Sequence, residues 1–142
     1  MMTRQLLRRS TVGLFVVAVM FTSASALQAQ SELKTADFYG TYELILPGAE
    51  QAGPGSEMIA TWTEEGMTVT QMDNVVIETG IELASTPGTM AIWDPNDENS
   101  ACGDEGLYLF EDDGTTITLS LLSDECEGRA QSADGARLIR LD

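Results

Sequence analysis

Residues 107–122 read LYLFEDDGTTITLSLL, two apolar runs on either side of an Asp-Gly pair. The pair Asp113-Gly114 is the strongest hairpin signal in the chain, because both residues accept the positive φ angles of a two-residue turn. Beyond the turn, every second residue is apolar: Ile117, Leu119 and Leu121. That period of two is typical of a half-buried strand. The stretch therefore predicts an antiparallel hairpin in which Asp112 faces Thr115.

The two cysteines of the chain, Cys102 and Cys126, lie on either side of this hairpin. In the predicted register they fall within one residue of facing each other, so their backbones come near enough for a bridge. A closed loop of about 25 residues would stabilise the fold by about 3.5 kcal/mol in the chain-entropy model. We therefore predict one disulfide, Cys102–Cys126.

The rest of the chain beyond residue 37 shows the same alternation, in short runs separated by turn-forming residues. The expected strands, about eight in number, cover 38–46, 58–63, 67–70, 75–84, 89–93, 107–111, 115–122 and 136–141. We also expect a bulge or bend at Gly80, a short helical turn within 31–37, and a polar loop over 123–135. Mostly short connections favour an all-β fold, a small antiparallel up-and-down barrel, over Greek-key crossings.

The first 26 residues have the order of a secretory signal peptide. Three arginines and no acid precede an apolar run over 12–21, which is too short for a permanent membrane anchor. We therefore predict a signal peptide over 1–26, a flexible leader over 27–36 and a barrel domain over 37–142. The mature chain should have no membrane span, and the expected location is secreted or periplasmic.

The mature chain is very acidic. The signal peptide takes three of the seven basic residues and none of the 23 acids, which leaves four basic residues and a net charge of −19. So dense a negative field repels nucleic acid and anionic membranes, which excludes both as partners. The acids are spread along the chain, so a saline host explains them best, with a cationic partner or metal ions as the alternative. We expect a monomer.

Residue types that support catalysis are scarce. The chain has no histidine, its cysteines are expected in a disulfide, and it contains no Gly-x-Ser-x-Gly nucleophile motif. We therefore predict that the protein is not an enzyme and, calcium aside, uses no cofactor.

Calcium is the one metal that the sequence suggests. The candidate ligands Asp94, Asn96, Glu98 and Glu105, together with Ser100, match five positions of an EF-hand-like loop. Their oxygen atoms are the hard ligands that Ca²⁺ prefers. However, Asn99 stands where such a loop needs glycine, and no helices are expected on either side. The alternative is a solvated acidic loop.

Two further segments carry motifs. The first is Asp37-Phe38-Tyr39-Gly40-Thr41-Tyr42. The second combines Cys102, then Glu105-Gly106-Leu107-Tyr108, then the hairpin, then Asp124-Glu125-Cys126-Glu127-Gly128-Arg129. The first resembles the opening Gly-x-Trp/Tyr strand of lipocalin-like (calycin) barrels. The second is similar to a C…EG-x-Y…hairpin…D-x-C-x-x-R pattern in small secreted bacterial proteins of that type.

This resemblance implies an eight-stranded barrel with an apolar interior, whose first strand opens at Gly40. It also implies that an arginine on or near the last strand packs across the opening aromatic residue, here Tyr42. The candidates for this role are Arg129, Arg137 and Arg140. The alternative is that these arginines are surface counter-charges among many acids.

The first hypothesis for function is therefore a lipocalin-like protein that binds a small apolar molecule inside the barrel. The candidate lining residues are Tyr42, Met58, Trp62, Trp93 and Tyr108. Large and adaptable side chains of this kind line ligand cavities, but they could equally fill a small barrel. The other hypotheses are a protein-binding barrel, such as a periplasmic protease inhibitor acting through residues 27–37 and its loops, and an acidic extracellular domain stabilised by calcium.

Overall fold

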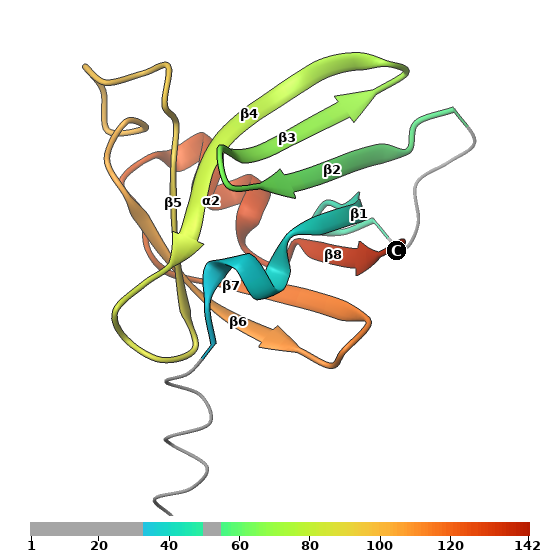
Figure 1. Cartoon of the computed structure of the whole chain (residues 1–142). Coiled ribbons are helices and arrows are strands. Elements are labelled where there is room, and N and C mark those ends of the chain that lie inside the picture. Colours follow the sequence, from blue (N-terminus) through green and yellow to red (C-terminus); the bar gives the residue numbers. More distant parts are fainter. Residues whose placement is uncertain (1–32, 50–54) are drawn as a thin grey trace, which may run out of the picture.

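The protein is described by a computed structural model over residues 33–49 and 55–142 (Figure 1). The predicted signal peptide and residues 27–32 of the predicted leader lie outside the described residues. Of the leader residues that are described, Thr35 and Ala36 belong to a short 3-10 helix, within the segment where a helical turn was expected.

The described residues form a closed antiparallel barrel of eight strands in up-and-down order. The elements are η1 (Thr35–Phe38), β1 (Gly40–Ile45), β2 (Met58–Thr63), β3 (Gly66–Gln71), β4 (Asn74–Leu83), β5 (Thr89–Trp93), β6 (Gly106–Asp112), β7 (Thr116–Ser123), α2 (Glu127–Ala133) and β8 (Arg137–Arg140). Each strand pairs with the next, and β8 closes the barrel on β1, where Tyr42 faces Arg140. The predicted fold class is therefore confirmed. None of the helices in residues 33–49 and 55–142 is long and apolar enough to cross a bilayer.

The predicted loop over 123–135 was wrong in part, because it contains α2. The helix is only seven residues long and has no buried residue, so the sequence EGRAQSA carries no apolar stripe from which a helix could be predicted. It begins directly after Cys126, and it lies against β7.

The predicted hairpin turn was wrong by one residue. Asp112 faces Ile117 instead of Thr115, and the Asp113 N–H donates to the Thr116 carbonyl at 3.1 Å. The two turn residues are therefore Gly114 and Thr115, and Gly114 has a φ of 91°. The Asp113 carboxylate accepts the N–H groups of Thr115 and Thr116 at 2.9 and 2.7 Å, so this side chain holds the start of the turn.

Gly80 is not a bulge, which was one of the two features expected there. Gly80 pairs directly with Trp93, and a Cβ on Gly80 would lie 2.0 Å from the Trp93 ring, so glycine is needed there for close packing. The irregularity lies between Val69 and Thr70 of β3, and it leaves Val76 as an extra residue on β4.

The first half of β4, before Gly80, separates from β5. The register pairs between the two strands begin at Gly80, and the far end of the β3–β4 hairpin diverges from β5 (Figure 1). Exposed apolar side chains gather on this hairpin: Met72, Val75, Val76 and Ile77. The barrel is therefore closed by strand pairing at one end of β4 and splayed at the other.

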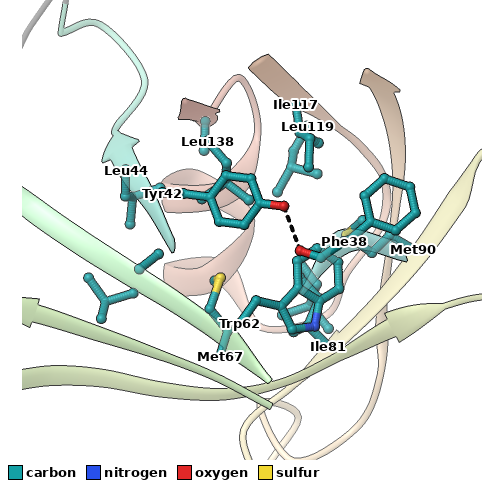
Figure 2. Close-up of a cluster of buried hydrophobic side chains, with 14 of the residues drawn as sticks. Phe38, Tyr42, Leu44, Trp62, Met67, Ile81, Met90, Ile117, Leu119 and Leu138 are labelled. Carbon is teal, nitrogen blue, oxygen red and sulfur yellow. Dashed lines mark hydrogen bonds between the residues drawn. The ribbon is translucent and has the colours of Figure 1, made fainter. Parts of the chain in front are cut away.

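Aromatic side chains fill the end of the barrel where β1 begins and where β2 and β6 finish. Phe38 of η1 stacks on Trp62, with ring centroids 5.7 Å apart, and meets Phe110 edge-on at 5.4 Å. The Tyr42 hydroxyl donates to the Phe38 carbonyl at 2.5 Å (Figure 2). The short helix η1 therefore plugs this end with a buried ring.

Arg140 of β8 lies across Tyr42, as the resemblance implied for an arginine of the last strand. Its guanidinium carbon lies 5.0 Å from the ring centroid, and Nη2 donates to the Tyr42 hydroxyl at 2.7 Å. A Cβ on Gly40, directly before this contact, would lie 2.9 Å from the carboxylate of Asp142. These contacts join the first strand of the barrel, β1, to the last strand, β8.

Candidate ligand-binding cavity

A cavity of about 310 Å³ lies at the end of the barrel opposite the aromatic plug. Strand ends from around the barrel contribute apolar walls, among them Leu44, Leu46, Val69, Ile77, Ile92 and Leu138. The antiparallel register places these strand ends together, because β1, β3 and β5 finish where β4 and β8 begin. The last part of α2, with Ser132 and Ala133, forms one side of the cavity. Both cysteines also line it.

The disulfide joins the loop before β6 to the start of α2. Cys102 and Cys126 are bonded, with their Cα atoms 4.7 Å apart, so the predicted pairing is confirmed. The Asp94 N–H also donates to the Cys102 carbonyl at 2.9 Å. The bridge thus fixes the loop that follows β5 against the helix that covers the cavity.

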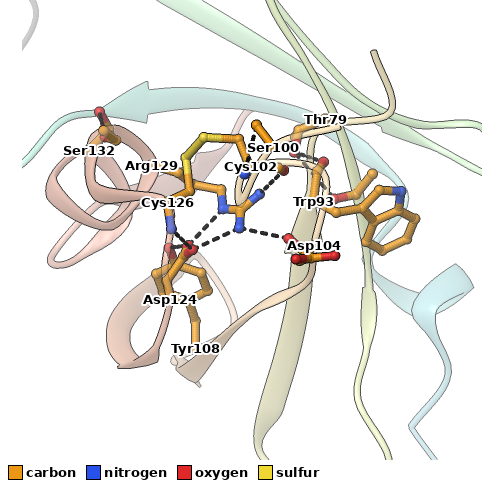
Figure 3. Close-up of polar contacts among 12 residues, drawn as sticks. Thr79, Trp93, Ser100, Cys102, Asp104, Tyr108, Asp124, Cys126, Arg129 and Ser132 are labelled. Carbon is orange, nitrogen blue, oxygen red and sulfur yellow. Dashed lines mark hydrogen bonds and ion pairs between the residues drawn. A yellow bond between two sulfur atoms is a disulfide. The ribbon is translucent and has the colours of Figure 1, made fainter. Parts of the chain in front are cut away.

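Arg129 of α2 is the centre of a buried polar cluster beside the disulfide (Figure 3). Its Nε and Nη2 donate to the two carboxylate oxygens of Asp124 at 2.6 and 2.7 Å. Nη1 donates to the Cys102 carbonyl at 2.6 Å and Nη2 to the Asp104 carbonyl at 2.8 Å. The arginine therefore fixes the backbone of residues 102–104 relative to the start of α2.

Asp124 accepts the other hydrogen bonds of this cluster. Its side chain is fully buried, and its carboxylate also accepts hydrogen bonds from the Tyr108 hydroxyl and from the Cys126 N–H. A Cβ on Gly106 would lie 2.2 Å from the nearer carboxylate oxygen, so only glycine fits beneath it. Six residues of the second sequence motif thus meet at one place: Cys102, Gly106, Tyr108, Asp124, Cys126 and Arg129. The residues of this motif therefore stabilise the wall of the cavity.

The cluster keeps its charges over a wide pH range. Burial alone would raise the pKa of Asp124, but hydrogen bonds from Arg129, Tyr108 and the Cys126 N–H outweigh it and hold that pKa below the usual 3.8. The pKa of Tyr108 is raised, first by burial and then by its hydrogen bond to Asp124. The hydrogen bond to Asp124 raises the pKa of Arg129. The carboxylate and guanidinium are therefore both charged at neutral pH.

We expect acid to destabilise the protein through Asp124. Below about pH 4 the unfolded chain binds a proton at Asp124 before the folded protein does. Because the folded pKa is the lower one, this contribution is lost as the pH falls through it. Urea unfolding from about pH 7 to about pH 2 checks this, and a free energy of unfolding that does not fall below about pH 4 would contradict it.

The five residues predicted to bind a ligand lie outside the cavity wall, and four of them lie in the core or pack against it. Tyr42, Trp62 and Tyr108 are fully buried, Met58 packs against the core, and Trp93 lies on Gly80. None of these five is among the residues that line the cavity. The lining consists mainly of aliphatic side chains at strand ends, which the alternation placed on the inner face but which nothing in the sequence marked as a binding surface.

The candidate calcium ligands form local loop contacts. The Asn96 N–H donates to Asp94 Oδ1 at 2.8 Å, and Asn96 Nδ2 donates to Glu78 Oε2 at 3.2 Å. Within residues 33–49 and 55–142 there is no group of three or more Cys, Asp or Glu side chains placed to hold a metal ion. Calcium binding through Asp94, Asn96, Glu98 and Glu105 stays a prediction.

Comparison of the chain with protein-family models, with curated proteins and with solved structures found no match. The inference of function therefore depends on the fold and on the geometry of the cavity.

Proposed function

We propose that this chain is an exported, lipocalin-like barrel that binds a small apolar molecule in the cavity between the strand ends and α2. The observation that carries the proposal is a cavity of about 310 Å³ whose walls are mostly aliphatic. That volume is at the lower end of the range for ligand pockets, and such pockets are mainly apolar with a few polar groups. The disulfide supports export, because such bonds persist in oxidising compartments.

The difference in packing between the two ends of the barrel supports this assignment. The aromatic residues and η1 fill the interior of one end, and the cavity with mostly apolar walls lies at the opposite end. The Asp124–Arg129 pair and the disulfide fix α2 beside the cavity, so its wall is built before a ligand arrives. A site already in its binding shape loses little conformational entropy on binding.

The test is binding of the neutral apolar dye N-phenyl-1-naphthylamine, followed by its fluorescence. We expect saturable binding to the wild-type protein and at least about tenfold weaker binding to Ala133→Trp, because an indole at this lining position would occupy the cavity. Gln131→Trp is the matched control, since it adds the same ring at an exposed position of α2 outside the cavity lining.

Equal affinities for the dye in the wild-type and Ala133→Trp proteins would place the binding elsewhere. No saturable binding by the wild-type protein would overturn the proposal. That second result would favour the protein-binding alternative, for which the exposed apolar half of β4 offers a surface.

A further inference from the structure

The charged residues that line the cavity give its lining a net negative charge. Three ionisable residues contribute to the lining: Glu78, Asp94 and Arg129. The charge of Arg129 is balanced by Asp124, with Nε and Oδ2 2.6 Å apart. Neither Glu78 nor Asp94 belongs to an ion pair formed by the described residues. Two acidic residues without an ion-pair partner among the described residues therefore lie at the lining of a mostly apolar cavity.

The two carboxylates lie on the same side of the cavity. Glu78 is on the part of β4 that has separated from β5, and Asp94 directly follows the end of β5. Asn96 connects them, because its backbone N–H donates to Asp94 and its side-chain amide donates to Glu78. Where the two strands meet again, Thr79 Oγ1 donates to the Trp93 carbonyl at 2.8 Å. The acids therefore stand at the opening between diverging strands.

Exposure distinguishes this opening from the interior. Glu78 is exposed and Asp94 is half-buried, whereas the aliphatic residues Val69 and Leu138 on the cavity wall are buried. Neighbouring Ile77 lines the cavity and is still 39% exposed, so an apolar surface continues from the interior to the rim. A ligand that fills this space meets hydrocarbon inside and negative charge where it reaches solvent.

We propose that the ligand is a cationic amphiphile, whose hydrocarbon part fills the cavity and whose ammonium group lies against the carboxylates of Glu78 and Asp94. This inference rests on the proposed function and adds the chemical class of the ligand. An ammonium donates hydrogen bonds to carboxylates and gains from their charge. An anionic head at the same place would meet two like charges, together with the negative field of the whole protein.

The experiment compares three ligands with the same eight-carbon chain: octylamine, 1-octanol and octanoate. Each is titrated by calorimetry into the wild-type protein at neutral pH and low ionic strength. We expect octylamine to bind at least about tenfold more tightly than octanoate, with 1-octanol between them. Added salt should reduce the difference, since the rim charges are partly in solvent.

Variants separate the two rim carboxylates from the overall charge. Glu78→Gln and Asp94→Asn each keep the acceptor oxygen for Asn96, and each should weaken octylamine binding about three- to tenfold while leaving 1-octanol unchanged. Glu82→Gln is the control, because it removes the same charge from an exposed position of β4 outside the cavity lining.

Three results would overturn the inference. Equal binding of the three ligands would show an apolar cavity without a head-group site, and the proposed function would stand. An equal effect of Glu82→Gln and Glu78→Gln on octylamine would show that only the general field acts. Failure of all three ligands to bind would overturn the proposed function together with this inference.

Discussion

Replacing Arg129 with methionine is expected to lower the free energy of unfolding by about 3–5 kcal/mol, the usual cost of removing one partner of a buried ion pair. The Asp124 carboxylate has no exposed surface, and it would keep only the Tyr108 hydroxyl and the Cys126 N–H as hydrogen-bond donors. The carbonyls of Cys102 and Asp104 would also lose the donor that Arg129 provides. Most of the loss comes from a charge left buried without its partner.

The measurement is urea unfolding followed by tryptophan fluorescence, with Asp142→Asn as the control. Asp142 forms an exposed pair with Arg140, at 3.9 Å, and such pairs contribute about 0–1 kcal/mol. Arg129→Met combined with Asp124→Asn should recover part of the loss, because the double variant buries no carboxylate. A loss for Arg129→Met as small as that for Asp142→Asn would contradict the assignment of Arg129 as the centre of the cluster.

Removing the disulfide by Cys102→Ser with Cys126→Ser is expected to destabilise the protein by about 3.5 kcal/mol in the chain-entropy model. The bridge closes a loop over a sequence separation of 24 residues, so the unfolded chain gains much freedom without it. Because both cysteines line the cavity, the loop after β5 and the start of α2 would then depend on the hydrogen bonds of Arg129 to stay together. Affinity for N-phenyl-1-naphthylamine should therefore fall several-fold.

Urea unfolding and dye titration of the same preparation separate the two effects of the disulfide. The wild-type protein with a reducing agent is the control, and it should match the double variant in both measurements. Full dye affinity in a destabilised double variant would show that the bridge supports the fold but not the cavity. Unchanged stability would contradict the chain-entropy estimate for this loop.

Errors in the sequence-based prediction have local physical causes. The hairpin turn moved by one residue because the Asp113 carboxylate accepts two N–H groups beyond it, a contact that the preference of Asp-Gly for two-residue turns does not include. Helix α2 was missed because a short helix without buried residues has no apolar period to detect. A bulge or bend was expected at Gly80 because a glycine within a strand looks the same in sequence whether the backbone is irregular or a ring packs on it.

Candidate binding residues were chosen by size, and none of the five lines the cavity. Large aromatic side chains offer the most surface for a ligand, but they also offer the most to the core, and Tyr42, Trp62 and Tyr108 are buried there. The cavity is instead lined by aliphatic residues at the opposite strand ends. The locations of η1, α2 and the diverging half of β4 decide which residues of the barrel interior stay uncovered. Contacts between residues distant in the sequence set those locations.

The sequence by itself determined the strands, their up-and-down order and the disulfide. Each of these follows from interactions between near neighbours: alternation of side chains along a strand, turn residues between strands, and two cysteines flanking one hairpin. Only the tertiary structure decided the cavity, the Arg129 cluster and the two carboxylates at the rim. Those features join residues that are separate in the sequence, and their positions follow from barrel closure and packing, which no local pattern contains.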